Sequence, residues 1–226
     1  MQHRLNILIL LTALLVCSCS RPALHTGDLV FVGIPANYHS SDSTSMSSAI
    51  ADATGDGELN LIHVAILEVK GDSIWTIDAT IDHGVDRHPL DTFFADFTLR
   101  DGSLPTFIIK RVKGESRKAL KGYIANADNY LGEPYDNGFL PDNGAHYCTE
   151  LVRDCYVTQD GEYLFDEAPM NFLDADGNLP AYWDKLFTSM GVPVPQGIPG
   201  TNPQDMSQSP LLVPVPIDLA DLAAKK

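Results

Sequence analysis

The chain has 226 residues, 44% of them hydrophobic, which is enough for one domain with a real hydrophobic core. Its formal net charge of −15 at pH 7 excludes the basic surface by which proteins bind DNA or RNA, so no nucleic-acid partner is expected. Anionic lipid headgroups would repel the same charge, and any membrane attachment must therefore have another source.

The N-terminus has the pattern of an export signal over residues 1–18. A short polar start precedes an almost unbroken apolar run from Leu5 to Val16, which is too short for a membrane-spanning helix. The run ends in VCSC, and a small residue just before a cysteine resembles the bacterial lipobox. That resemblance implies cleavage before Cys19, a lipid on that cysteine and a linker over residues 19–26. The alternative is a plain secretory signal cleaved nearby.

Both interpretations take the mature protein out of the cytoplasm. With the lipid in place, the chain is expected in the cell envelope, anchored to a membrane on its periplasmic or outer-membrane side. The membrane is then a partner through the lipid anchor alone.

Four short apolar runs predict strands, at residues 28–33, 61–70, 73–80 and 106–112. The second and third runs are separated by Gly71-Asp72, which is typical of a hairpin turn. The stretch between the first two runs, residues 36–60, is rich in Ser, Asp, Thr and Gly and predicts a loop or a helical excursion.

Helices are predicted by apolar spacing of three to four at residues 115–130, 149–156 and 181–190. Strands that precede helices indicate one α+β domain, here residues 27–190. Residues 191–226 are rich in Pro, Gly and Ser, and we expect them to wrap the surface without a core of their own.

Two cysteines remain in the mature domain, Cys148 and Cys155. Seven positions on one helix correspond to about 10 Å of rise, too far for a disulfide, so both thiols are expected to be free. A small apolar residue on a buried helix face explains Cys155. A free Cys148 in an oxidising compartment needs a further reason.

Two groups of short motifs suggest that reason. The first comprises GDLVF at 27–31, HVAI at 63–66 and IDA at 77–79; the second comprises LGEPY at 131–135 and YCTELV at 147–152. Each group resembles one half of the NlpC-type cell-wall hydrolases, in which a G-x-P-Y stretch leads to a cysteine that opens a helix. Thr149 replaces the usual Ser and Ala65 the usual Gly, and both departures are mild.

The two halves stand in swapped order, because the histidine strands precede the cysteine helix. This order resembles the circularly permuted branch of the superfamily, the YiiX/YebB-like proteins. The later stretches 169–172 and 199–203 and Trp183 are also similar to that branch. The resemblance implies a circularly permuted papain-like fold, in which an antiparallel sheet packs against the helix that carries the nucleophilic cysteine.

The catalytic residues that we expect are Cys148, His63 and Asp78. Unpaired N–H groups at a helix start favour a thiolate, which makes Cys148 the nucleophile. His63 lies in an apolar strand and is the best candidate base, the alternative being a satisfied core histidine. Asp78 lies across the predicted hairpin, where a carboxylate can accept the N–H of the far ring nitrogen. It could instead be a solvated strand end, and Asp82 is its substitute.

Further residues are expected to line the cleft. The backbone N–H of Cys148 is the first oxyanion donor, and Tyr135 is either a second donor or a core aromatic. Tyr147 is grouped with Tyr135, and the segment Met170 to Phe172 offers apolar side chains for a cleft wall.

Three other titratable residues have weaker assignments. His146 could line the cleft without being the base, and His88 is placed in a polar turn after the second hairpin strand. Glu150 is expected to cap the helix or to pair with a basic residue.

The resemblance implies an envelope cysteine hydrolase without metal or cofactor, which cleaves an amide or ester through a thioester on Cys148. The candidate substrates are the peptide stems of peptidoglycan and acyl-amides or esters of lipid type. Three alternatives stay open: an acyltransferase in which an amine or alcohol replaces water, an inactive module that binds a peptide or acyl chain, and a structural lipoprotein.

Overall fold

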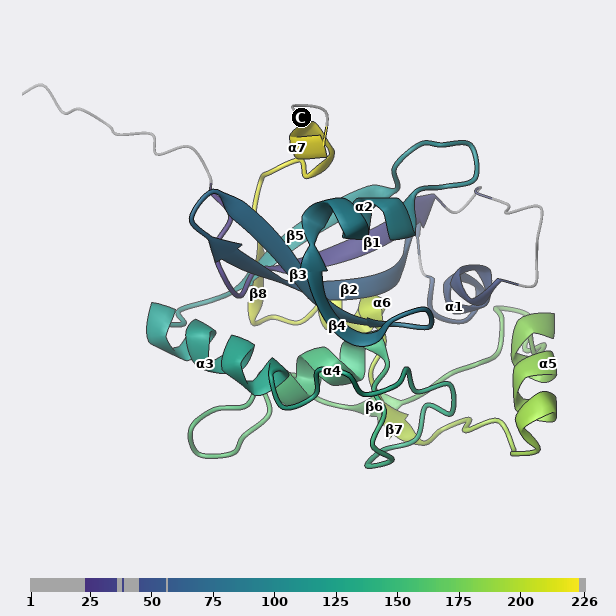
Figure 1. The fold of residues 1–226 in the computed structure, drawn as a ribbon. Helices are drawn as coiled ribbons and strands as arrows, with labels where there is room; N and C mark the ends of the chain where they lie inside the picture. The colour runs from purple at the N-terminus through teal and green to yellow at the C-terminus, as the bar shows by residue number, and fades with distance from the viewer. Residues whose placement is uncertain (1–22, 36–37, 39–44, 56, 224–226) are drawn as a thin grey trace, which may run out of the picture.

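The computed structural model describes residues 23–35, 38, 45–55 and 57–223 (Figure 1). The predicted signal and the lipidation site Cys19 lie outside these residues. Within the described part, no helix is both long enough and apolar enough to cross a membrane.

The centre of the fold is a six-stranded sheet in which every neighbouring pair is antiparallel, in the order β4-β3-β2-β1-β5-β8. Its strands are β1 (Leu29–Pro35), β2 (Leu59–Lys70), β3 (Ser73–Thr80), β4 (Gly84–Pro89), β5 (Thr106–Val112) and β8 (Leu212–Pro214). A separate two-stranded ribbon joins β6 (Ala168–Pro169) to β7 (Pro199–Gly200).

The helices flank this sheet. They are α1 (Met46–Thr54), α2 (Leu90–Phe97), α3 (Arg117–Ala127), α4 (Cys148–Cys155), α5 (Ala181–Met190), α6 (Pro203–Ser207) and α7 (Ala220–Ala223). The mixed α+β class and the antiparallel sheet against the cysteine helix are therefore confirmed.

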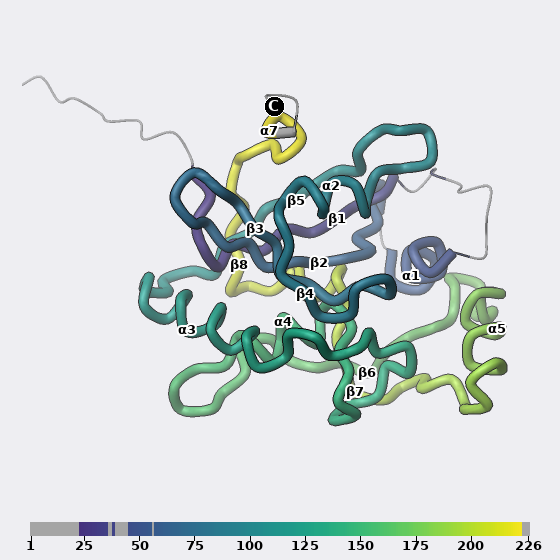
Figure 2. The backbone as a smooth tube through the Cα atoms, in the orientation of Figure 1, coloured from purple at the N-terminus to yellow at the C-terminus, as the bar shows by residue number. Residues whose placement is uncertain are grey.

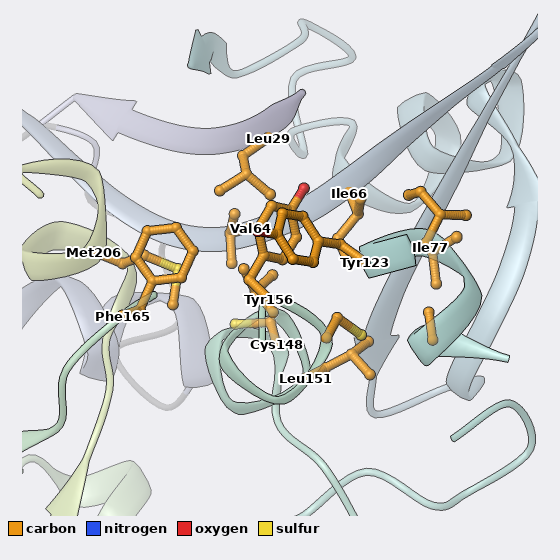
Figure 3. Packing of buried hydrophobic residues seen from close by; sticks show 14 of the residues in the cluster. Leu29, Val64, Ile66, Ile77, Tyr123, Cys148, Leu151, Tyr156, Phe165 and Met206 are labelled. Carbon is orange, nitrogen blue, oxygen red and sulfur yellow. The ribbon is translucent and has the colours of Figure 1, made fainter. Parts of the chain in front are cut away.

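Alternation along the central strands divides the core into two layers. Leu29 and Phe31 point to the face covered by α3 and α4, whereas Val30 and Val32 point to the face covered by α2. The tube in Figure 2 shows α2 on one side of the sheet and the two other helices on the opposite side. Figure 3 shows the α4 layer, in which Cys148 and Leu151 lie below strand residues such as Val64. The cysteine is thus held by the main core.

The sequence pattern did not predict two elements that follow the β2–β3 hairpin, namely β4 and α2. Residues 84–89, GVDRHP, lack an apolar run, yet they form strand β4 because they pair with the open edge of β3. The turn into α2 follows at once, and Phe93 and Phe94 of that helix are buried against the sheet. Only the neighbouring strand supplies the pairing that makes this polar segment a strand.

The segment after residue 190 also contributes to the core. Strand β8 extends the sheet beyond β5 and buries Leu212, while Met206 of α6 is buried in the same layer as α4. Val215 and Leu219 are buried on the other face. The Pro- and Gly-rich segment therefore crosses from one core layer to the other as it wraps the domain.

A buried ion pair holds the start of β1 to β5. The Asp28 side chain is fully buried and receives Arg111 Nε at 2.5 Å and Arg111 Nη2 at 2.8 Å on its two carboxylate oxygens. The backbone N–H of His25 donates to the same carboxylate at 2.8 Å. Charge-assisted bonds of this bidentate kind are strong and geometrically specific.

We expect Asp28→Asn to lower the free energy of unfolding by about 2–3 kcal/mol, because the variant leaves the Arg111 guanidinium without its buried counter-charge. Urea unfolding followed by circular dichroism measures the loss. Asp101→Asn is the matched control, since Asp101 is exposed and accepts hydrogen bonds from Ser103, two residues further along the chain. Equal stability of Asp28→Asn and the unmodified chain would show that the pair contributes nothing.

Candidate active site

The nucleophile candidate Cys148 is the first residue of α4 and is 4% exposed. Tyr147 before it is extended, with φ −93° and ψ 169°, so the helix begins abruptly at the cysteine. The first N–H groups of a helix have no partner within it, and they surround the Cys148 side chain with partial positive charge. Both described cysteines are buried and free of disulfides, as expected.

The start of α4 is fixed by the LGEPY stretch. The backbone N–H of His146 donates to Pro134 O at 3.1 Å, and that of Asp136 donates to His146 O at 3.1 Å. The same stretch is fixed to β4, because the N–H of Val85 donates to Glu133 O at 2.8 Å. The approach is so close that a Cβ on Gly84 would lie 2.2 Å from Glu133 O. The sheet edge and the cysteine are therefore held in register through one short segment.

His63 and Asp78 meet beside the nucleophile. The β2–β3 ladder stops at Ile66 and Ile77, and both residues lie just beyond this last pair. His63 Nε2 lies 2.7 Å from Asp78 Oδ2, and the two side chains are almost completely buried. The imidazole also packs on the ring of Phe97, with the centroids 4.5 Å apart.

The electrostatics of this pair favour an imidazolium. Burial by itself lowers the pKa of His63, but the charge of Cys148 and the hydrogen bond to Asp78 raise it to about 10. Burial raises the pKa of Asp78, and the stronger effect of hydrogen bonds from His63 and His88 brings it below its ordinary value. His63 is hydrogen-bonded to Asp78 and close enough to Cys148 for the charge of the thiolate to raise its pKa, so the structure brings the three expected residues together.

His88 is the residue that the sequence reading placed wrongly. It lies in β4 opposite Thr76, is 4% exposed, and its Nε2 is 2.9 Å from Asp78 Oδ1. Burial lowers the pKa of His88 and the bond to Asp78 raises it, with a net increase. The sequence analysis placed His88 in a turn and therefore did not predict this contact. The pairing of β4 with β3 is what directs His88 toward Asp78.

Beside Cys148 lies a narrow cleft with about 40 Å³ of free volume. Four expected residues line it, namely Tyr135, Tyr147, Met170 and Phe172. No Asp, Glu, Lys or Arg is among the described residues that line this cleft. Its remaining lining residues are Ile50, Ala53, Thr54, Phe139, Thr149, Asn171, Trp183, Thr201, Asn202 and Pro203.

The two tyrosines differ in what their hydroxyls do. The Tyr147 hydroxyl accepts the backbone N–H of Thr201 at 3.0 Å, so it holds the 199–203 segment against α4. The Thr149 hydroxyl donates to Thr201 O at 3.0 Å and reinforces that contact. The Tyr135 hydroxyl has only the weak acceptor Met46 Sδ at 3.5 Å among its described partners, and burial raises its pKa well above the ordinary value. The Tyr135 hydroxyl therefore stays protonated, and it can donate a hydrogen bond to an oxyanion.

One wall of the cleft comes from α1 and α5, which the sequence did not associate with the site. The indole N–H of Trp183 donates to Ala49 O at 3.3 Å, and the Asn171 side chain donates to Ala53 O at 2.9 Å. These bonds hold α1 across the apolar end of the cleft. The polar composition of residues 36–60 contains no sign of this packing.

A separate cluster surrounds His146. Its Nδ1 lies 2.7 Å from Glu133 Oε2 and its Nε2 lies 3.3 Å from Asp154 Oδ2, so both nitrogens are occupied away from the nucleophile. Burial raises the pKa of Glu150 to about 8; the charge of His146 opposes this increase, and weaker repulsion by Asp136 adds to it. Glu150 lies 3.4 Å from the Tyr147 N–H, which agrees only weakly with the capping role expected of it.

We expect Glu150→Gln to stabilise the fold increasingly as the pH rises. An unfolded glutamate ionises near pH 4.3 whereas folded Glu150 ionises near 8, so the fold binds the extra proton between these values and loses stability with rising pH. Melting temperatures of variant and unmodified chain should coincide at pH 4 and diverge toward pH 8. A constant difference at all pH values would contradict this prediction.

The described residues contain no group of three or more His, Cys, Asp or Glu side chains placed to hold a metal ion.

Comparisons with known proteins agree with this geometry. Residues 23–215 match the family described as "Permuted papain-like amidase enzyme, YaeF/YiiX, C92 family". A crystal structure described as metalloprotein YiiX from Escherichia coli O157:H7 superposes with a TM-score of 0.63 at 26% sequence identity. That match covers 84% of this chain and 96% of the other. A search among curated proteins finds no match.

The match spans most of the chain and includes the cysteine helix, the histidine strand and the swapped order of the two halves. The chain therefore belongs to the YaeF/YiiX family of permuted papain-like amidases.

Proposed function

We propose that this protein is a cysteine hydrolase of the cell envelope that cleaves an amide or ester bond next to an apolar acyl group. The observation that carries the proposal is the buried His63–Asp78 bond of 2.7 Å beside a cysteine at the start of a helix. This arrangement supplies a nucleophile, an acid–base group and its orienting carboxylate in one place.

In the first half of the reaction the Cys148 thiolate attacks the acyl carbonyl carbon and forms the C–S bond. The carbonyl oxygen becomes an oxyanion that accepts hydrogen bonds from the Cys148 backbone N–H and the Tyr135 hydroxyl. When the tetrahedral centre collapses, the bond to the amine or alcohol breaks and the His63 imidazolium protonates the leaving group. Asp78 keeps the ring oriented for this transfer.

In the second half, neutral His63 takes a proton from water, and the hydroxide attacks the thioester. The C–S bond breaks, the acid leaves, and the thiolate–imidazolium pair is restored. The buried carboxylate of Asp78 stabilises the imidazolium in each half of the cycle.

The lining of the cleft supports an apolar acyl group. It is narrow and aromatic, and apart from the Cys148 thiolate none of its described lining residues is an Asp, Glu, Lys or Arg. A peptide stem of peptidoglycan brings carboxylates, which would lose hydration in such a cleft without a cationic partner. A hydrocarbon chain loses nothing there and gains from burial. A lipid on Cys19 would hold the site near a membrane, where acyl substrates are found.

The first test is the rate of Cys148 alkylation by iodoacetamide as a function of pH, in the purified full-length chain. We expect labelling to persist well below about pH 8.5, where an ordinary thiol ionises, and to slow at least about tenfold at pH 6 in His63→Ala. Cys148→Ala is the control that subtracts labelling of the other three cysteines of the full-length chain. A rate that follows an ordinary thiol and ignores His63 would remove the nucleophile assignment.

The second test concerns the acyl group. We expect Ala53→Trp to reduce kcat/KM for a dodecanoyl amide or ester at least about tenfold while acetyl substrates are unaffected, because the indole fills the apolar end of the cleft. Ala53→Ser is the matched control and should behave as the unmodified chain. Mass spectrometry with added amines distinguishes hydrolysis from acyl transfer. Equal losses for both chain lengths would place the acyl group elsewhere.

A further inference from the structure

The Asp78 carboxylate is shared by two histidines on opposite sides. His63 Nε2 lies 2.7 Å from Oδ2, and His88 Nε2 lies 2.9 Å from Oδ1. The three residues come from β2, β3 and β4, and all are buried. The proposed mechanism needs only the contact between Asp78 and His63, so the contact between Asp78 and His88 requires its own explanation.

The hydrogen-bond pattern determines the proton on His88 Nε2. An ionised carboxylate only accepts, so a ring nitrogen 2.9 Å from it must carry the hydrogen. The other nitrogen, Nδ1, lies 3.1 Å from the Thr76 hydroxyl and 3.4 Å from Pro89 O. Thr76 can donate to a neutral ring, or it can accept from a protonated ring while donating to His88 O at 3.2 Å. The Nε2–H bond to Asp78 therefore persists in both charge states of His88.

The contact removes a freedom that Asp78 would otherwise have. The terminal torsion of an aspartate is broad and roughly two-fold, so a carboxylate held at one oxygen can rotate away from its partner. With His88 on Oδ1, the plane of the carboxylate is defined by two bonds and Oδ2 stays directed at His63. A hydrogen bond to the far side of an orienting side chain commonly fixes the direction in which that side chain points.

We propose that His88 is a positioning residue of the active site, which acts through Asp78 to hold the His63 imidazolium. The inference rests on the proposed function and adds a fourth residue to it. The chain of hydrogen bonds then runs from Thr76 through His88 and Asp78 to His63, whose charge acts on Cys148.

The charged groups around His88 indicate one competing effect, which is repulsion between a protonated His88 and the His63 imidazolium. Asp78 faces it from β3, with His63 behind that carboxylate, and Asp96 of α2 contributes a more distant negative charge. The ring of His83 lies 6.2 Å away between centroids, and Phe93 of α2 covers it at 6.5 Å. If His88 acted mainly as a second cation, its removal would raise the pKa of His63, whereas loss of positioning lowers that pKa.

The test is the pH titration of the His63 ring by nitrogen-15 NMR in the full-length chain, with the resonance assigned from His63→Ala. We expect His88→Leu to lower the His63 midpoint by at least about one pH unit, because Asp78 no longer stays directed at the imidazolium. His88→Gln presents an N–H donor at a similar reach and should restore most of the shift. His83→Leu is the matched control, and its His63 midpoint should equal that of the unmodified chain.

Each other outcome overturns the inference. An unchanged midpoint in His88→Leu with a lowered melting temperature shows a purely structural role, and a raised midpoint shows a competing cation. Failure of His88→Gln to restore the shift shows that the donor is not what matters. Failure of the proposed function is seen separately, as ordinary-thiol labelling of Cys148 in the unmodified chain.

Discussion

The burial of one ionised carboxylate is the constraint on which the rest of this site depends. Asp78 is 1% exposed, and a buried charge is costly unless donors surround it. His63 and His88 supply those donors, and they reach Asp78 because β2 and β4 flank its strand β3. The sheet edge β4-β3-β2 is thus organised around a negative charge, and the imidazolium of His63 is what that charge stabilises beside Cys148.

The candidate nucleophile Cys148 is held by hydrophobic packing of its helix. Helix α4 places Cys148 at its start while Leu151 and Cys155 of the same helix are buried in the core. The 131–135 stretch joins both parts, because its backbone bonds β4 on one side and the residue before Tyr147 on the other. Polar and apolar forces therefore act on different elements and converge on one pair of side chains.

The cleft beside Cys148 is built from other elements than the hydrogen-bonded network around Asp78. Its walls come from α1, the segment before α4, and the 170–172 and 199–203 stretches, none of which contributes to the Asp78 network. Under the proposed function, changes in α1 are expected to alter which acyl group fits while the thiolate–imidazolium pair stays intact. This separation is the physical basis for testing the two parts of the proposal independently.

Local periodicity and short motifs were enough to predict the four apolar strands, three helices and the α+β class, and to single out Cys148, His63 and Asp78 as candidates. Three features could not be predicted in this way: the polar segment 84–89 forms a strand, His88 bonds Asp78, and α1 packs across the cleft. These features depend on pairing and packing between segments far apart in the chain. A strand whose pattern is polar forms because a neighbour offers its edge, and no local property of its own residues reveals that edge.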